Sequence, residues 1–304
     1  MRTVAPAKIN WTLEVLGRRE DGYHESRSVM QTIDLCDEVT VRKGNRKSEI
    51  GNRGTIVSTG SATLAVEGDL DAGENDLTLR AVRALEDATG WALPVTISLV
   101  KRIPVAAGLG GGSSDAAAVL RGLDRLWGLG WDNDRQAEGA ARIGSDVTFF
   151  LSGGTALAGG RGECITPLSD APTAWLVLLV PPIKVPGKTR RMYETLTAEH
   201  FSDGSRSEVL SQRLRREEPV RQEDLYNAFE RVAYDVFEGL EAYRDALLEA
   251  GAKAAHLAGA GPALFALTES EAEAKDLAER VQAPGAKVFV TRTLSAQEGT
   301  AITD

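Results

Sequence analysis

One stretch decides how this chain is interpreted: Pro104-Val105-Ala106-Ala107-Gly108-Leu109-Gly110-Gly111-Gly112-Ser113-Ser114-Asp115. Its three consecutive glycines let a backbone approach a ligand closely and adopt dihedral angles that side chains forbid. A helical pattern begins directly behind them, and a helix start offers unpaired N–H groups and the positive end of a dipole. These features favour a phosphate site over a tight structural turn.

The loop differs from two common phosphate-binding motifs. A Walker A loop places a lysine after its glycines, and no lysine follows Gly110–Gly112. A dinucleotide fingerprint has a third glycine at the position where Ser113 stands. The loop therefore predicts that a nucleotide or a phosphorylated substrate binds, but not through a Walker A or a dinucleotide-binding motif.

Composition and charge narrow the class of protein. The 304 residues, 42% of them hydrophobic and 26% charged, are typical of a soluble globular protein of one large or two ordinary domains. A net charge of -9 argues against nucleic acid as a partner, so a phosphate site must be local. No stretch resembles a signal peptide or a membrane span. Two cysteines, Cys36 and Cys164, are too few for a disulfide framework, so we expect buried free thiols and a cytoplasmic location.

Apolar periodicity predicts a mixed α and β chain. We expect strands at residues 9–16, 95–99, 175–180 and 287–293, a meander over 38–66, and an apolar strand region over 147–158. Helices are expected from a cap at Asn75 or Asp76, from Ser113 or Ser114 to Gly128, from Asp132 to Ile143, across Leu225–Ala250 with a break near Gly239, and over 270–281. The charged segment 200–224 is expected to be a solvated helix and loop.

Three short motifs carry candidate chemistry, each with a structural alternative. Lys8 lies in a small apolar segment and could stabilise a transferring phosphoryl group, or could be a strand-end lysine. Tyr23 and His24 could bind a base, or could form a surface turn. Asp146 could be a carboxylate in a cleft that orients an alcohol, or a helix or turn cap.

Taken together, these motifs resemble the GHMP kinase superfamily. The opening Lys8-x-Asn10, the turn Asp21-Gly22-Tyr23-His24, the glycine loop and Gly144-Ser145-Asp146-Val147 occur in the expected order. The match is closer to the branch that phosphorylates a cytidine-diphosphate-linked methylerythritol in the non-mevalonate isoprenoid pathway. The resemblance implies transfer of a phosphoryl group from ATP, with Mg²⁺, to the 2-hydroxyl of that small molecule.

The resemblance also implies an α+β fold in two domains. The N-terminal domain, residues 1–168, would resemble the second domain of ribosomal protein S5, and the C-terminal domain, 169–304, would resemble a ferredoxin-like sandwich. Pro167 and Pro172 punctuate a polar stretch at this boundary. The active site would lie in the cleft between the domains.

Site residues are implied position by position. Lys8 and Asp146 would be the catalytic pair, and Ser113 or Ser114 could reach Mg²⁺. Asn75 or Asp76 falls where the family contacts adenine, and Gly259 and Gly261 match the third glycine motif. The ATP-binding residues would be Pro104, Val105, Ala106, Ala107, Gly108, Leu109, Gly110, Gly111, Gly112, Ser113 and Ser114, and the substrate-binding residues Asn10, Tyr23, His24, Thr189 and Tyr193.

The sequence departs from the family pattern at five positions: Ala258, Ala260 and Pro262 in the third motif, Thr148 in place of proline, and Asp115 in place of asparagine. Asp115 would add negative charge near the phosphates. Two alternatives stay open: another small-molecule kinase of the superfamily, of the mevalonate or homoserine type, and a nucleotide-binding module without catalysis. A mevalonate or homoserine acceptor has no use for an aromatic cytosine clamp.

Overall fold

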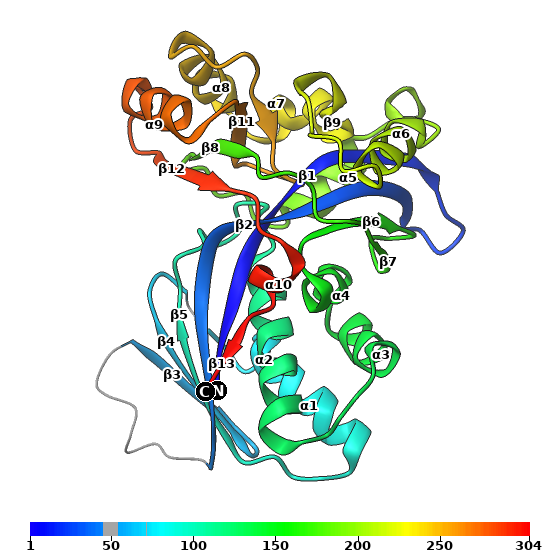
Figure 1. The fold of residues 1–304 in the computed structure, drawn as a ribbon, viewed down its shortest axis with the longest axis vertical. Helices are drawn as coiled ribbons and strands as arrows, with labels where there is room; N and C mark the ends of the chain where they lie inside the picture. Colours follow the sequence, from blue (N-terminus) through cyan, green and yellow to red (C-terminus); the bar gives the residue numbers. More distant parts are fainter. Residues whose placement is uncertain (45–53, 71) are drawn as a thin grey trace.

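Two long strands run through the centre of the molecule (Figure 1). The computed structural model describes residues 1–44, 54–70 and 72–304. In it, β1 (Arg2–Arg18) and β2 (His24–Lys43) pair antiparallel along nearly their whole length, joined by a turn that contains Gly22. The strand predicted at 9–16 is therefore present and longer than its alternation indicated, because the buried pattern continues in both directions.

The remaining strands of the first sheet flank this pair. The order β13-β1-β2-β5-β4-β3 includes β3 (Thr55–Thr59), β4 (Ala62–Glu67), β5 (Val95–Val100) and β13 (Ile302–Thr303). Near their other ends, β2 pairs with β6 (Thr155–Gly159), which pairs with β7 (Cys164–Pro167), and β1 pairs with β9 (Tyr226–Asn227). The predicted meander over 38–66 corresponds to the end of β2 with β3 and β4, and its residues 45–53 lie outside the described residues.

Four helices pack beside this sheet: α1 (Leu77–Thr89), α2 (Gly111–Trp127), α3 (Asn133–Ile143) and α4 (Ser145–Ser152). Asp76 caps α1 by accepting a backbone N–H group, as predicted, and Asp132, where the next helix is expected to begin, caps α3 in the same way. Gly128 ends α2 in the left-handed conformation. The predicted cap of α2 at Ser113 or Ser114 is wrong. Gly110, with φ 73°, holds that position, because the chain must turn through a left-handed residue to enter the helix.

The apolar run that begins at Val147 is helical up to Ser152, so the strand prediction is wrong there. Gly144 ends α3 and immediately precedes α4, and Phe149 and Phe150 bury their rings in the core beside α2. The strand β6 begins only after Gly153 and Gly154, which both have positive φ. Short apolar runs do not distinguish a buried strand from a buried helix, and the tertiary packing decides between them.

The second sheet has the order β10-β11-β8-β12, all antiparallel. Its strands are β8 (Trp175–Val180), β10 (His256–Leu257), β11 (Leu264–Thr268) and β12 (Lys287–Arg292), which confirms the predictions at 175–180 and 287–293. One face packs on β1 and β2 through residues such as Ile9, Trp11 and Leu178. The other face packs on α7 (Ala233–Val236), α8 (Leu240–Glu249) and α9 (Glu271–Arg280).

The segment 200–224 docks on β1 and is less solvated than predicted. It contains α6 (Ser205–Leu214) and η3 (Gln222–Asp224), and follows α5 (Lys188–Thr195) and η2 (Ala198–His200); η4 (Ala228–Arg231) comes after it. Leu210 and Leu214 are buried. The buried Glu14 carboxylate accepts hydrogen bonds from the amide and hydroxyl of Ser207, at 2.8 and 2.7 Å.

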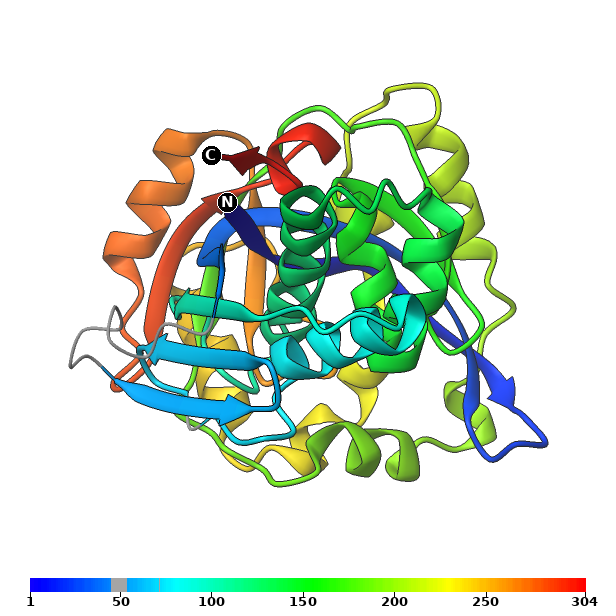
Figure 2. The same cartoon turned by 90° about the horizontal axis from the view of Figure 1, so that it is seen from below.

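The end of the chain returns to the first sheet. After β12, α10 (Ala296–Gly299) leads into β13, which pairs with β1, so the two termini lie side by side in both views (Figures 1 and 2). The periodicity did not predict these two elements. Both cysteines are free, but Cys164 is exposed and Cys36 only half-buried, so the expectation of buried thiols is wrong. No helix in the described part of the chain is long and apolar enough to cross a membrane.

Candidate active site

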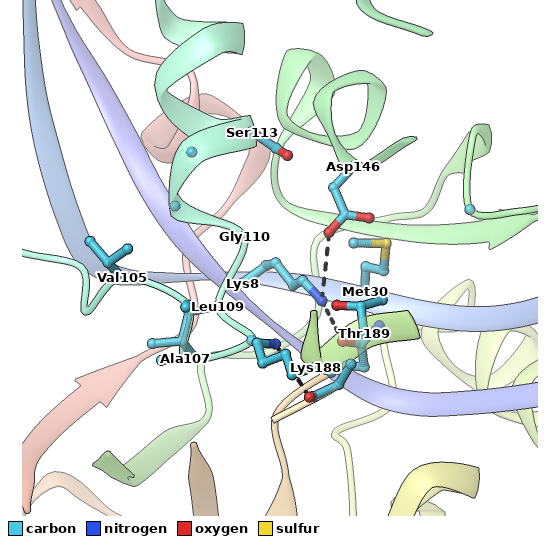
Figure 3. A pocket seen from close by; sticks show the side chains of 18 of the residues that line it. Lys8, Met30, Val105, Ala107, Leu109, Gly110, Ser113, Asp146, Lys188 and Thr189 are labelled. Carbon is cyan, nitrogen blue, oxygen red and sulfur yellow. Dashed lines mark hydrogen bonds and ion pairs between the residues drawn. The ribbon is translucent and has the colours of Figure 1, made fainter. Parts of the chain in front are cut away.

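A cavity of about 560 Å³ collects most of the residues that the motifs singled out (Figure 3). The glycine loop from Pro104 to Ser113 forms one wall. Lys8 and Asn10 of β1, Asp146 of α4, and Thr189 and Tyr193 of α5 contribute to the others. The site therefore lies where elements of both halves of the chain meet.

The glycine loop is held in place by its backbone. The amide of Lys8 donates to the carbonyl of Leu109 at 2.9 Å, and the amide of Ala263 donates to that of Ala107 at 3.0 Å. Gly108 (φ 95°) and Gly110 (φ 73°) have dihedral angles that favour glycine. A Cβ at Gly110 would meet the Phe150 ring at 2.8 Å, so the loop packs too closely for a side chain there.

Lys8 is the buried cation at the centre of the cavity. Its ammonium donates to Asn10 Oδ1 at 2.7 Å and lies 3.9 Å from Asp146 Oδ2. Asn10 is oriented in turn by Ser28, whose Oγ accepts from Asn10 Nδ2 at 2.7 Å. Burial lowers the pKa of Lys8, and the Asp146 carboxylate opposes that shift. This pair can align an alcohol and offset negative charge beside it.

The third glycine loop closes the cavity from the C-terminal half. Asn227 Nδ2 donates to the carbonyl of Gly259 at 2.8 Å. A Cβ at Gly259 would lie 2.8 Å from the carbonyl oxygen of Gly108 and 2.9 Å from Lys8 Nζ. The loop at Gly108 and the loop at Gly259 thus approach each other through their backbones. This approach does not involve the side chains at 258 and 260, where alanine departs from the family pattern.

Comparisons with known proteins agree with this geometry. Residues 76–154 match the GHMP kinases N-terminal domain, and 211–287 match the GHMP kinases C-terminal family. A 4-diphosphocytidyl-2-C-methyl-D-erythritol kinase from Dehalococcoides mccartyi is 39% identical over 96% of this chain and 97% of its own. The chain belongs to the GHMP kinase family.

Solved structures extend the match. The crystal structure of a 4-(cytidine 5'-diphospho)-2C-methyl-D-erythritol kinase superposes with a TM-score of 0.77 at 33% identity, over 96% of this chain and 99% of that one. A homoserine kinase from Cytophaga hutchinsonii, at 16% identity and a TM-score of 0.69 over 99% of this chain and 96% of its own, shares the fold. The predicted two-domain α+β GHMP kinase fold is therefore confirmed.

A buried ion cluster supports the glycine loop of this GHMP kinase. Lys101 Nζ lies 2.5 Å from Asp37 Oδ2 and 2.8 Å from Asp115 Oδ2, and all three side chains are almost fully buried. Burial acts to lower the pKa of Lys101, but the two carboxylates outweigh this effect, so the net shift of its pKa is upward. Burial raises the pKa of Asp115, and the positive charge of Lys101 opposes that shift. The carboxylate expected to add charge at Asp115 thus shares the Lys101 ammonium with Asp37.

The aromatic residues of the kinase are only partly brought together. His24 stacks on Tyr193, with ring centroids 4.9 Å apart and planes 21° apart. Tyr23 is 58% exposed and lies under the guanidinium of Arg161, whose Cζ is 4.8 Å from the ring centroid. Neither Tyr23 nor His24 lines the cavity, whereas Tyr193 and Arg161 do.

Two further predicted residues lie apart from the cavity lining. Ser114 is fully buried within α2 and does not line the cavity, while Ser113 does. Of the two candidates for adenine contact, Asp76 lines the cavity and Asn75 does not.

Sequence reasoning missed three cations that line the cavity: Lys101, Arg161 and Lys188. Lys101 stands between the strand expected at 95–99 and the glycine loop, and a cation at the end of that apolar strand could have signalled a buried pair. Arg161 lies among glycines between β6 and β7. Lys188 directly precedes the predicted Thr189 and carries no signal of its own, since its neighbours come from distant segments.

Proposed function

We propose that this chain transfers the γ-phosphoryl group of ATP to the 2-hydroxyl of 4-diphosphocytidyl-2-C-methyl-D-erythritol, a step of the non-mevalonate route to isoprenoid precursors. One observation carries the proposal: the Lys8–Asp146 pair lies in one cavity with the glycine loop. The 39% identity, over 96% of the chain, to a kinase of that name supports the choice of acceptor.

ATP would lie along the glycine loop. The backbone from Pro104 to Ser113 would wrap the phosphates, at the N-terminus of the 17-residue helix α2, whose dipole favours negative charge. Leu70, Leu77 and Val105 line the same cavity and offer apolar surface for the adenine ring, with Asp76 beside them.

Mg²⁺ would be held chiefly by the phosphates. Among the described residues, no cluster of three or more His, Cys, Asp or Glu side chains could hold a metal. Mg²⁺ in kinases keeps several waters and takes one or two protein ligands besides the phosphates, which fits this donor set. Ser113 and Asp146, both in the cavity lining, are the residues that would reach it, and the ion would neutralise charge on the phosphates.

The acceptor would occupy the other side of the cavity. Asn10 and Thr189 would contact its methylerythritol part, and the aromatic group of Tyr23, His24 and Tyr193 would hold the cytosine. His24 and Tyr193 lie in direct contact, so a base held between them requires the rings to separate. The enzyme would work as a cytoplasmic protein, in keeping with its two free cysteines.

The transfer depends mainly on aligning the acceptor hydroxyl with the γ-phosphate. The acceptor oxygen forms a bond to the γ-phosphorus while the bond from that phosphorus to the bridging oxygen breaks, and ADP leaves with the electron pair. Asp146 would take or orient the hydroxyl proton. Lys8 would lie beside the Asp146 carboxylate and offset charge on the transferring group, and Asn10 would fix the Lys8 ammonium.

A coupled ADP-release assay tests the proposal. Mg²⁺-ATP is offered with the cytidyl acceptor, mevalonate or homoserine side by side. Turnover with the cytidyl acceptor alone supports the proposal. Turnover of another acceptor would contradict the cytosine clamp, and ATP binding without turnover of any would favour a non-catalytic module.

A further inference from the structure

Lys188 is a cation in the active-site cavity that the proposed roles do not use. It is the first residue of α5, and its side chain points toward the Lys8–Asp146 pair (Figure 3). Its ammonium donates to the carbonyl of Ala260, in the third glycine loop, at 3.3 Å. That loop touches both Gly108 and Lys8, so Lys188 lies near the junction of the two glycine loops.

The charges of the cavity leave Lys188 unmatched. Lys8 pairs with Asp146, Lys101 with two buried carboxylates, and Arg161 with Glu163 at 3.4 Å. Within residues 1–44, 54–70 and 72–304, Lys188 alone of the cations lining this cavity forms no ion pair. Lys188 is half-buried, and a cation partly withdrawn from water without a carboxylate partner is costly unless an anion compensates it.

The protonation of Lys188 reflects this environment. Burial and, after it, the charge of Lys8 together lower the pKa of Lys188 to about 8, while Asp146 acts in the opposite direction. Perturbed groups of this kind gather where a ligand binds. An anionic ligand would raise the pKa again and restore the full positive charge.

The position of Lys188 in the cavity indicates which anionic group it would bind. ATP would approach along the glycine loop, and the acceptor hydroxyl would lie beside Asp146. Lys188 donates to Ala260, next to Gly259, which packs against Gly108 of the glycine loop and against Lys8, so its ammonium stands near the point between donor and acceptor. The cation nearest to Tyr23, at the end proposed for cytosine, is instead Arg161.

We infer that the Lys188 ammonium binds non-bridging oxygens of the γ-phosphate of ATP and holds that group as it passes to the acceptor. This rests on the proposed ATP-dependent transfer. Lys188 stays protonated while the new oxygen–phosphorus bond forms and the bridging bond breaks. It thus serves as a catalytic residue beside the third glycine loop, offsetting charge on the equatorial oxygens.

Nucleotide binding isolates the γ-phosphate contact. Calorimetry with Mg²⁺ compares ADP and a non-hydrolysable ATP analogue in wild type, Lys188→Met, Lys188→Arg and Lys184→Met, the last being an exposed lysine outside the cavity lining. Lys188→Met should lower the preference for the analogue over ADP about tenfold, and Lys188→Arg should restore part of it. A preference within twofold of the Lys184→Met control overturns the inference.

Kinetics supply the second readout. Lys188→Met should lower kcat by about 10²- to 10³-fold, the range for loss of one preorganised donor. In wild type, kcat/KM for ATP should fall as the pH rises above about 8, and Lys188→Arg should reduce the part of that decline due to Lys188, because arginine stays charged. An increase confined to the KM of the acceptor would reassign Lys188 to the acceptor's diphosphate and overturn the γ-phosphate role.

The proposed function and the role of Lys188 can be refuted separately. If wild type turns over no cytidyl acceptor, the proposed function is wrong, yet the nucleotide preference still tests Lys188. If wild type is active and Lys188→Met matches Lys184→Met, only the inference about Lys188 is wrong.

Discussion

Replacing Gly259 with alanine tests how closely the two glycine loops must approach. Gly259 has φ 55°, and a Cβ there would lie 2.8 Å from the carbonyl oxygen of Gly108 and 2.9 Å from Lys8 Nζ. The Gly108 carbonyl belongs to the backbone, so it cannot shift unless the whole glycine loop moves. The second neighbour is the ammonium proposed for catalysis, and the oxygen that it bonds, Asn10 Oδ1, would lie 3.3 Å from the same Cβ.

The size of the effect follows from these distances. A left-handed conformation costs alanine about 1–2 kcal/mol, and overpacking against fixed atoms adds about 1–3 kcal/mol. The total of about 2–5 kcal/mol corresponds to a fall in Tm of about 3–8 °C, since a chain of 304 residues unfolds with an entropy of about 0.6 kcal/mol/K. Lys8 must also shift by about 0.5 Å, and since a misplacement of about 1 Å costs about 100-fold, we expect kcat to fall about tenfold.

Gly128→Ala is the matched control. Gly128 has φ 64°, similar to Gly259, but nothing lies within 4 Å of the position of its Cβ. It should therefore show only the conformational cost of about 1–2 kcal/mol, with kcat unchanged. Thermal unfolding followed by circular dichroism gives Tm, and the coupled ADP-release assay gives kcat. Equal Tm values for the two variants, with Gly259→Ala retaining kcat within twofold, would refute the reasoning.

Three further predictions concern single residues. Asp146→Ala should lower kcat by about 10²- to 10⁴-fold if the carboxylate accepts or orients the proton; near-wild-type turnover in the coupled assay contradicts that role. Lys101→Met should lower the free energy of unfolding by about 3–5 kcal/mol, because it leaves buried carboxylates uncompensated; a denaturant titration measures this, and adding Asp115→Asn should recover part of the loss. Burial, followed by Arg18, lowers the pKa of His24 below 6.5, so the unfolded chain takes up the proton first and stability falls as the pH drops through about 6.5. His24→Asn should flatten that part of a Tm–pH curve, and an identical slope would show that His24 does not contribute.

Local signals predicted the parts of the fold that local interactions determine. Asp76 and Asp132 cap helices through N–H groups two and three residues away, so the sequence alone reveals them. Gly128 and Gly239 likewise mark helix ends within a few residues. The helix at Ser145–Ser152 escaped prediction because its apolar run fits two structures, and packing against α2 selects one.

The site residues that belong to sequence motifs could be predicted, whereas those brought together only by the tertiary fold could not. Lys8, Asp146 and the glycine loop stand in recognisable segments. The partner of Lys101 lies 64 residues away at Asp37, and Lys188 meets Ala260 across 72 residues. No spacing rule links such pairs, so only the folded chain shows that Lys101 is matched while Lys188 lacks a carboxylate partner.

The long strand β1 has a consequence for the evolution of this chain. The buried apolar side chains form three clusters, and β1 contributes to each of them. Ala5 packs in the cluster between the first sheet and α1–α4, Ile9 in the cluster between the two sheets, and Leu13 in the cluster beneath α7, α8 and α9. It also pairs with β9 and β13, which come from the far half of the sequence. A recombination event that joined one relative's residues 1–168 to the remainder of another would therefore bring together β1 and partners that had never been selected together. We expect viable hybrids to inherit β1, β9 and β13 from the same parent, so that exchange in this lineage would follow the shared strand rather than the midpoint of the sequence.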